Sequence, residues 1–136
     1  MARWSDATLG EEFGPQEFHL SSKLHRRYID GAHNELPEHA DIVDPSVAGN
    51  FAIFVLGARY PGPIIHTHQE LKYFSPVKVG DTVVARGVLS LKETRRDKAY
   101  VAIDCDFFRG EEPNVEKVWS AKMTCIWPEV HLRGEV

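Results

Sequence analysis

The sequence predicts an α+β fold in which one antiparallel sheet wraps around a single long helix. Two observations lead to this prediction. Residues 45–59 are apolar on almost every side, which is typical of a helix enclosed by other elements. After residue 64, apolar and polar residues alternate in four segments, as in antiparallel strands with one face in water. A sheet packed on one buried helix satisfies both patterns with a single core.

Length and composition set the broad class of the protein. With 43% hydrophobic and 26% charged residues, the chain fits one domain over residues 1–136, with 1–14 as an irregular lead-in and 129–136 as a tail. The net charge of −4 gives no reason to bind nucleic acid. The longest apolar run, 51–58, is too short to cross a membrane, and the N-terminus has no apolar signal segment, so a cytoplasmic protein is expected.

Two short elements are expected before the central helix. Residues 16–20 predict an edge strand. Ser21 and Ser22 are favourable N-cap residues for a short helix near 23–31. Residues 32–44 are then expected to form a loop that is rich in ionisable side chains.

The central helix is expected to begin at Asp44 and Pro45. Aspartate can cap the free N–H groups of a first helical turn, and proline suits the first helical position. Gly49 lowers the helix propensity by about 1 kcal/mol, so another backbone is expected to approach it closely. The Pro-Gly-Pro sequence at 61–63 ends the element.

The rest of the chain is expected to form four strands. They span residues 64–74, 82–93, 100–108 and 115–127. Gly87 suggests a β-bulge in the second of these strands. His66 and His68 alternate along the first strand, so they are expected on one solvent-facing side.

The two cysteines are expected to be buried, small apolar side chains. If the last two strands form a hairpin centred near residue 112, Cys105 lies opposite about residue 119. Cys125 is then several residues away along the sheet, which argues against a disulfide between Cys105 and Cys125.

The segment 70–128 contains Phe74-Ser75-Pro76-Val77 followed by Gly80-Asp81-Thr82. It resembles the MaoC-like branch of the hot-dog fold, which comprises (R)-specific enoyl-thioester hydratases and 3-hydroxyacyl dehydratases. Members carry a strand, an aromatic residue, Ser/Arg-Pro-Val, two further residues and Gly-Asp-Thr/Leu before three antiparallel strands. The resemblance covers residues 10 to 128 approximately and implies a single hot-dog domain.

The active motif of that family, D-x-N-P-x-H, is best matched by the sequence N-E-L-P-E-H at 34–39. His39 takes the place of the motif's histidine, and Pro37 that of its proline. Asn34 stands where the family has its aspartate, and Leu36 where it has asparagine. An amide cannot accept and hold a proton as a carboxylate can, so this departure bears directly on activity.

The resemblance implies addition of water to a 2-enoyl thioester, or its removal from a 3-hydroxyacyl thioester. This reaction needs a base, an acid and a group that stabilises negative charge on the thioester oxygen. His39 is the candidate acid/base, since histidine titrates near pH 6.5. The backbone N–H groups of Ser46 and Val47, at the positive end of the central helix, are the candidate oxyanion donors.

The side chains that assist His39 stay open at this point. Asp41 is slightly favoured as the carboxylate that orients it, and Asp30 and Glu35 are alternatives. His33 competes with His39 for the role of base.

No metal or other cofactor is expected. The histidines and carboxylates of residues 33–41 match no His-Glu-x-x-His or cysteine-based metal pattern.

Three functions stay open, and two of them are enzymatic. The sequence favours an enzyme. The first is a hydro-lyase, a hydratase or dehydratase acting on a CoA or acyl-carrier thioester. The second is a catalytically impaired hot-dog subunit that binds acyl thioesters or completes a partner's active site; Asn34 favours it, although this amide could still orient water or the thioester. The third is an acyl thioesterase that uses a carboxylate to activate water.

A homodimer, or a heterodimer with a related hot-dog subunit, is expected. One such sheet leaves an edge strand and one face of the helix uncovered, and pairing of two sheets covers both. The family resemblance implies that the acyl site lies at this dimer interface.

Overall fold

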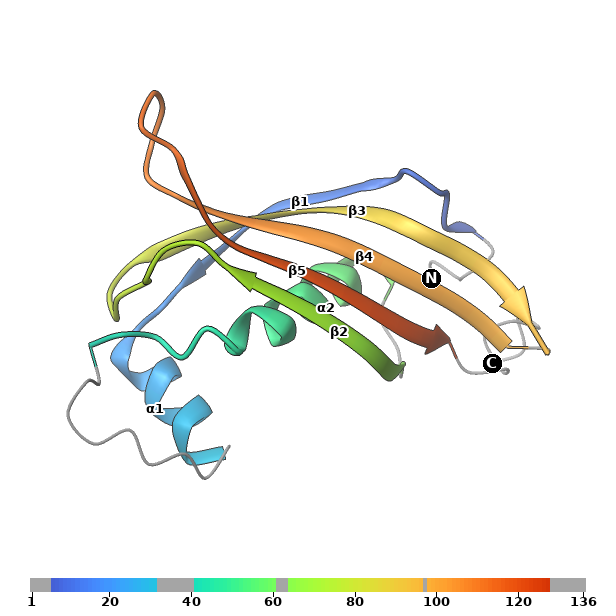
Figure 1. Cartoon of the computed structure of the whole chain (residues 1–136), viewed down its shortest axis with the longest axis horizontal. Helices are drawn as coiled ribbons and strands as arrows, with labels where there is room; N and C mark the ends of the chain where they lie inside the picture. The colour runs from blue at the N-terminus through green and yellow to red at the C-terminus, as the bar shows by residue number, and fades with distance from the viewer. Residues whose placement is uncertain (1–5, 32–40, 61–63, 97, 128–136) are drawn as a thin grey trace.

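The computed structural model describes residues 6–31, 41–60, 64–96 and 98–127. In this part of the chain the elements are β1 (Glu12–His19), α1 (Ser22–Gly31), α2 (Val47–Arg59), β2 (Ile65–Tyr73), β3 (Thr82–Arg95), β4 (Lys98–Arg109) and β5 (Glu116–Trp127). The strands form one antiparallel sheet in the order β1-β3-β4-β5-β2 (Figure 1). The predicted α+β class is therefore confirmed.

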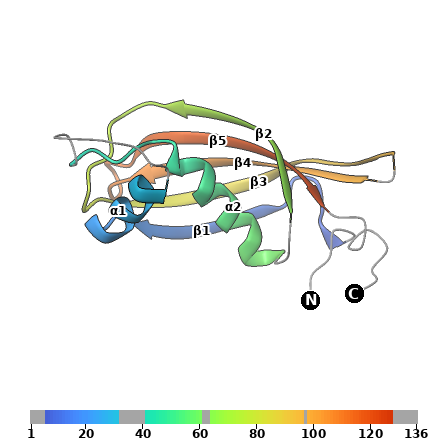
Figure 2. The same ribbon diagram turned by 90° about the horizontal axis from the view of Figure 1, so that it is seen from below.

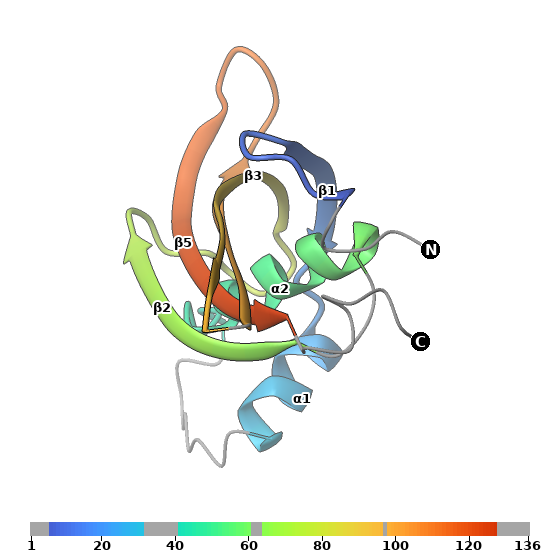
Figure 3. The same cartoon turned by 90° about the vertical axis from the view of Figure 1, so that its right-hand side faces the viewer.

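The sheet curves around α2. Figure 2 shows α2 on one face of the sheet, with α1 near the end of β1. In Figure 3 the strands curl around α2, with the edge strands β1 and β2 on either side of it. The helix thus lies in the concave face of the sheet, and its first turn is held inside the fold.

Helix α2 is buried because its residues are small or apolar around most of its circumference. Its buried members are Val47, Ala48, Gly49, Phe51, Ala52, Val55 and Leu56. The helix begins at Val47, two residues after the predicted start, because residues 45 and 46 form a tight turn. Asp44 caps this turn as expected: its Oδ1 accepts hydrogen bonds from the N–H of Ser46 at 3.0 Å and from the hydroxyl of Ser46 at 2.8 Å.

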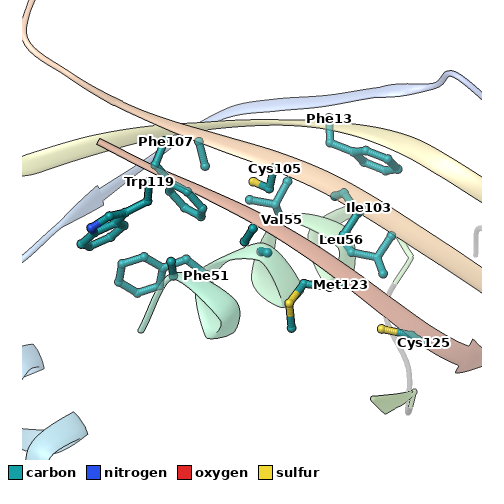
Figure 4. Close-up of a cluster of buried hydrophobic side chains, with 14 of the residues drawn as sticks. Phe13, Phe51, Val55, Leu56, Ile103, Cys105, Phe107, Trp119, Met123 and Cys125 are labelled. Atoms are coloured by element: carbon teal, nitrogen blue, oxygen red, sulfur yellow. The ribbon is translucent and has the colours of Figure 1, made fainter. Parts of the chain in front are cut away.

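The core lies between α2 and the inward face of the sheet, as Figure 4 shows. Phe51 of α2 stacks on Phe18 of β1 at 4.2 Å between ring centroids, and its ring lies 6.4 Å from Phe107 of β4 and 6.5 Å from Trp119 of β5. The apolar residues that alternate along β4 and β5 are buried, as expected for strands with one face in water: Val101, Ile103, Cys105, Phe107, Trp119, Ala121, Met123, Cys125 and Trp127.

The prediction was wrong at the N-terminal side of β1. Residues 12–14 belong to the strand and not to an irregular lead-in, because Glu12 pairs with Val88 and Phe13 with Gly87. The pairing register shifts between Phe13 and Gln16, where Gly14 interrupts the apolar alternation. That interruption hid the first half of the strand from a reading of local periodicity.

Strand β2 contains a second irregularity that changes the placement of its histidines. The register shifts between His66 and His68, so His66 pairs with the buried Cys125 whereas His68 pairs with Thr124. Neighbouring partners on β5 point to opposite faces of the sheet. Both histidines are exposed, as expected, but the expectation that they share one face was wrong.

The pairing of β4 with β5 corrects the predicted cysteine register by two residues. Cys105 pairs with Ala121, not with residue 119, and Cys125 pairs with Val101. Both cysteines are free and buried, which confirms the expectation that they form no disulfide with each other.

Two glycines meet side chains at close range. The predicted irregularity at Gly87 is present against β1, where the register shifts between the pairs Phe13–Gly87 and Gln16–Ala85 and the extra residue lies on β1. The irregularity of β3 against β4 lies further along the strand, between Leu89 and Leu91. A Cβ on Gly87 would lie 2.8 Å from Cδ1 of Ile103. A Cβ on Gly49 would lie 2.8 Å from Oε1 of Gln69, so a side chain, and not the predicted backbone, occupies that space.

Candidate functional site

The candidate site is built on the segment that leads into α2. The backbone N–H of Asp44 donates a hydrogen bond to Nε2 of His25 at 3.3 Å. His25 comes from α1 and is only 6% exposed, and it is the buried polar side chain that stands out in the described part of the chain. This contact places α1 against the entrance to α2.

The same segment is fastened on its other side to the turn before β3. The N–H of Val43 donates to the carbonyl of Val77 at 2.7 Å, and the N–H of Val79 donates to the carbonyl of Asp41 at 2.8 Å. Backbone hydrogen bonds therefore fix residues 41–43 against residues 77–79 before the helix begins.

The predicted oxyanion donors lie in the first turn of α2. The N–H of Ser46 donates to Oδ1 of Asp44 at 3.0 Å, and the N–H of Val47 donates to the carbonyl of Asp44 at 3.2 Å. The next two amides, of Ala48 and Gly49, make bonds of 3.1 and 3.3 Å within the same turn. The bonds from Val47 and Gly49 are longer than the usual 2.9–3.0 Å, and all four groups lie at the positive end of the helix dipole.

The structure describes only some of the side chains that the sequence predicts for the site. His33, Asn34, Glu35 and His39 lie outside the described residues, and so does the side chain of Asp30. Asp41 is exposed at the start of the segment that leads into α2.

Gln69 contacts the first turn of α2, and the sequence did not reveal this contact. It pairs with the buried Met123, so it lies on the inward face of β2. Its Oε1 occupies the space beside Gly49, in the first turn of α2. An unexplained glycine in an apolar helix was the available signal, but the identity of its neighbour depends on the pairing of β2 with β5.

An apolar cavity of about 310 Å³ adjoins the entrance to α2. Its walls include Ile42, Val43, Pro45, Tyr73, Phe74 and Trp119. Pro45 directly precedes Ser46, so one wall of the cavity is continuous in sequence with the predicted oxyanion donors. Residues 75–77, which contain the Ser-Pro-Val sequence, close one side of it.

Arg109 holds the wall formed by the Ser-Pro-Val segment. Its Nη1 donates to the carbonyl of Pro76 at 2.7 Å and to Oδ2 of Asp81 at 3.0 Å, and its Nη2 donates to Oε1 of Glu116 at 2.6 Å. The hydroxyl of Ser75 donates to Oε2 of Glu116 at 2.6 Å. The hydrogen bonds from Ser75 and Arg109 lower the pKa of the Glu116 carboxyl, which therefore stays ionised in this network.

A second polar cluster lies at the other end of α2. The Tyr60 hydroxyl donates to the Glu11 carboxylate at 2.8 Å, and Arg59 pairs with the same carboxylate at 2.6 Å. Burial and the bond to Glu11 raise the pKa of Tyr60 to about 12. This cluster ties the lead-in of β1 to the C-terminal end of α2, far along the helix from the candidate site.

Residues 6–31, 41–60, 64–96 and 98–127 contain neither a metal-binding cluster nor a helix suited to span a membrane. No three His, Cys, Asp or Glu side chains there are grouped to hold a metal ion. No helix in these ranges has the length and apolar character needed to span a membrane.

Comparisons with known proteins identify the fold. No family model matches the chain. The MaoC-like dehydratase of Rhodospirillum rubrum superposes with a TM-score of 0.69 at 15% identity, covering 93% of this chain and 96% of that one. The 3R-hydroxyacyl-ACP dehydratase complex HadBC of Mycobacterium tuberculosis gives a TM-score of 0.71 at 16% identity, covering 88% and 96%. The protein has the hot-dog fold.

A short sequence match agrees with this hot-dog assignment. An (R)-specific enoyl-CoA hydratase of Rhodospirillum rubrum is 48% identical over 40 residues, which is 29% of this chain and 28% of the hydratase. The resemblance to MaoC-like hydratases and dehydratases that the sequence predicts is thereby confirmed. The match spans under a third of the hydratase, so the activity of that protein enters below only as a proposal.

Proposed function

We propose that this chain is a hydro-lyase that adds water to a 2-enoyl thioester, or removes it from a 3-hydroxyacyl thioester. The observation that carries the proposal is the rigid entrance to α2, where unoccupied space adjoins a turn of backbone N–H groups. The similarity of the chain to hydratases and dehydratases in sequence and fold supports this reaction class.

In the proposed reaction, His39 removes a proton from water while the water oxygen bonds to the β-carbon of the substrate. The electrons of the carbon–carbon double bond move toward the thioester, and its oxygen becomes negatively charged. The protonated His39 then gives this proton to the α-carbon, which restores the neutral thioester and the neutral histidine. The base and the acid are matched to this task when their pKa values lie near the working pH.

The N–H groups of Ser46 and Val47 are proposed to stabilise the charged thioester oxygen. A donor of this kind contributes about 3–4 kcal/mol to the transition state. Without substrate, the carboxylate and the carbonyl of Asp44 accept the hydrogen bonds of these two N–H groups. In the proposed complex, the thioester oxygen would accept them instead of Asp44.

The remaining roles are proposed for the side chains predicted from the sequence. Asp41 orients His39, with Asp30 as the alternative carboxylate. Asn34 holds the water or the thioester by hydrogen bonds. His33 is the alternative base.

A second candidate function rests on Asn34. An amide at the position of the family's aspartate favours a subunit that binds acyl thioesters and completes the active site of a related partner. The similarity to HadBC, a dehydratase that is described as a complex, supports this alternative.

We propose that two hot-dog chains pair through β2. This strand forms the edge of the sheet next to β5. Ile65 and Tyr73, at its two ends, are 57% and 49% exposed. Phe54, on the neighbouring helix α2, is 56% exposed. An uncovered edge strand beside exposed apolar side chains is a surface that a second chain would cover. The acyl site would then lie at the interface.

The reaction is tested with the purified chain and crotonyl-CoA. Loss of the enoyl absorbance is expected, with a decrease of at least 100-fold in kcat for His39→Ala, since general acid–base catalysis contributes about 10²–10⁴-fold. His19→Ala is the matched control, because His19 is exposed on β1 and its side chain hydrogen-bonds to the hydroxyl of Thr82, on the neighbouring strand β3. Unchanged turnover in His39→Ala would contradict the assignment of the base.

Two further readouts separate the alternatives. Release of free thiol would identify a thioesterase, because hydration leaves the thioester intact and releases no thiol, although both reactions reduce the absorbance of the enoyl thioester. No turnover by the chain alone, with activity restored by a second hot-dog subunit, would identify the impaired subunit.

A further inference from the structure

We propose that the 310 Å³ cavity beside the entrance to α2 binds the acyl chain of a thioester, and that it favours linear chains of medium length. This inference rests on the proposed function for the choice of a thioester as ligand. The cavity itself follows from the described side chains.

The first argument is the position of exposed apolar side chains. Among the described residues, eight large hydrophobic side chains are exposed, and three of them, Ile42, Tyr73 and Phe74, line this one cavity. Their exposed fractions are 42%, 49% and 54%. Clustered apolar exposure on a soluble fold is typical of a binding surface, and the chemistry of these walls selects a hydrocarbon.

The second argument is the rigidity of the walls. One wall, residues 42–45, is bonded through Val43 to Val77 at 2.7 Å. The adjoining wall, residues 75–77, is held by Arg109, which bonds to the carbonyl of Pro76. The floor is Trp119, which is 1% exposed and packed against Phe51 and Phe107. A preformed apolar pocket of this kind binds without a large ordering cost.

The third argument is the alignment of the cavity with the proposed chemistry. Pro45 lines the cavity and is followed directly by Ser46 and Val47. A chain that fills the cavity therefore brings its thioester end close to the N–H groups proposed to receive the oxygen. The cavity between β2, β4 and β5 does not have this relation, since it is lined by charged side chains such as Glu70, Lys72 and Asp104.

The volume sets the expected chain length. A closed apolar cavity of about 150 Å³ holds benzene, a molecule of six carbons. A cavity of 310 Å³ therefore accommodates a linear chain of about six to ten carbons. Longer chains would extend into water and gain little further affinity.

Calorimetric titration of the full chain with butanoyl-CoA, octanoyl-CoA, hexadecanoyl-CoA and free CoA tests the inference. These saturated thioesters cannot be hydrated, so binding is measured without the proposed reaction. Each buried methylene strengthens binding by about fourfold. Octanoyl-CoA is expected to bind at least tenfold more tightly than butanoyl-CoA, and hexadecanoyl-CoA to bind within about threefold of octanoyl-CoA.

Ile42→Trp is designed to fill the cavity, and Val88→Trp is its matched control. Val88 is 40% exposed, close to the 42% of Ile42, but it lies on β3 away from the cavity walls. The tenfold preference for octanoyl-CoA is expected to fall to about twofold or less in Ile42→Trp and to persist in Val88→Trp. Thermal unfolding verifies that both variants are folded, and Phe74→Ala, which removes a wall, provides a second variant with a weakened preference.

Equal binding of butanoyl-CoA and octanoyl-CoA by the unmodified chain would overturn the inference. An equal loss of preference in Ile42→Trp and Val88→Trp would overturn it as well. A chain-length preference that depends on Ile42, in a protein that does not turn over crotonyl-CoA, would support the cavity assignment while rejecting the proposed hydration.

Discussion

At the scale of single residues, Asp44 and His25 organise the entrance to α2. Asp44 accepts two hydrogen bonds from Ser46 through its carboxylate and donates its own N–H to His25. The capping role could be predicted from the sequence, because aspartate before a proline and an apolar helix is a local signal. The role of His25 could not be predicted, because the bond joins residues 19 positions apart in different elements.

The two cysteine thiols give a prediction that depends on pH. Burial, and then the charge of Asp106, raises the pKa of Cys105 to about 12, and burial raises that of Cys125 to about 11. In the unfolded chain the thiols titrate near 8.5. Above about pH 8.5 the folded state therefore binds more protons than the unfolded state, and its free energy of unfolding decreases as the pH rises toward 11.

Thiol titration and urea unfolding measure this effect. At pH 8 the thiols of the folded chain are expected to react negligibly with a disulfide reagent, whereas both thiols should react in the unfolded chain. The urea concentration at the midpoint of unfolding should decrease as the pH is raised from about 8.5 to about 10.5. Rapid reaction of a thiol in the folded chain, or a midpoint that rises with pH, would contradict the burial of these side chains.

At the scale of elements, Gly14 allows β1 to pair closely with β3. Its φ of +85° lies in the left-handed region, and a Cβ there would lie 2.6 Å from the carbonyl oxygen of Ala85. This residue explains why β1 continues through a position at which local periodicity predicts no strand. Strand β2 also has an irregularity, between His66 and His68. Such an irregularity changes which face of the sheet the neighbouring side chains point to.

Gly14→Ala and Gly10→Ala form a matched pair that tests this interpretation. Gly10 has nearly the same φ, +87°, but no atom lies within 4 Å of its added Cβ. Gly10→Ala should therefore cost only the conformational strain, about 1–2 kcal/mol. Gly14→Ala should cost more, since the strand must also move away from β3. Urea unfolding measures both free energies, and equal losses would show that the contact with Ala85 is unimportant.

At the scale of the whole molecule, the curved sheet encloses α2 but leaves the β2 side uncovered. A dimer formed along this edge would cover Ile65 and the exposed inner face of the strand. An inserted lysine at such an edge must give up its hydration on association, which opposes pairing.

Ile65→Lys should therefore weaken the proposed dimer. Light scattering of the unmodified chain is expected to give twice the 15.4 kDa mass of one chain, and Ile65→Lys should shift the mass toward one chain. Leu9→Lys is the control, because Leu9 is 62% exposed but precedes β1, at the opposite edge of the sheet. A dimer that survives Ile65→Lys, or dissociates equally in Leu9→Lys, would place the interface elsewhere.

Much of the fold could be predicted from the sequence, because periodicity is a local property. The alternation in β4 and β5 predicted which side chains enter the core, and the apolar run of α2 predicted the helix that they cover. The candidate site was less accessible. The position of the candidate donors Ser46 and Val47 at the start of α2 could be predicted from the capping signal, whereas that of Gln69 could not, since it depends on how β2 pairs.

The sequence by itself determined the order of the elements, the inward residues of the long strands, the capped start of the central helix and the resemblance to MaoC-like proteins. Only the tertiary structure decided the extent of β1, the faces of His66 and His68, and the contact of Gln69 with Gly49. The physical reason is that strand register is set by pairing between distant segments. A bulge in one strand shifts the side chains around it to the other face, and no local pattern records that shift.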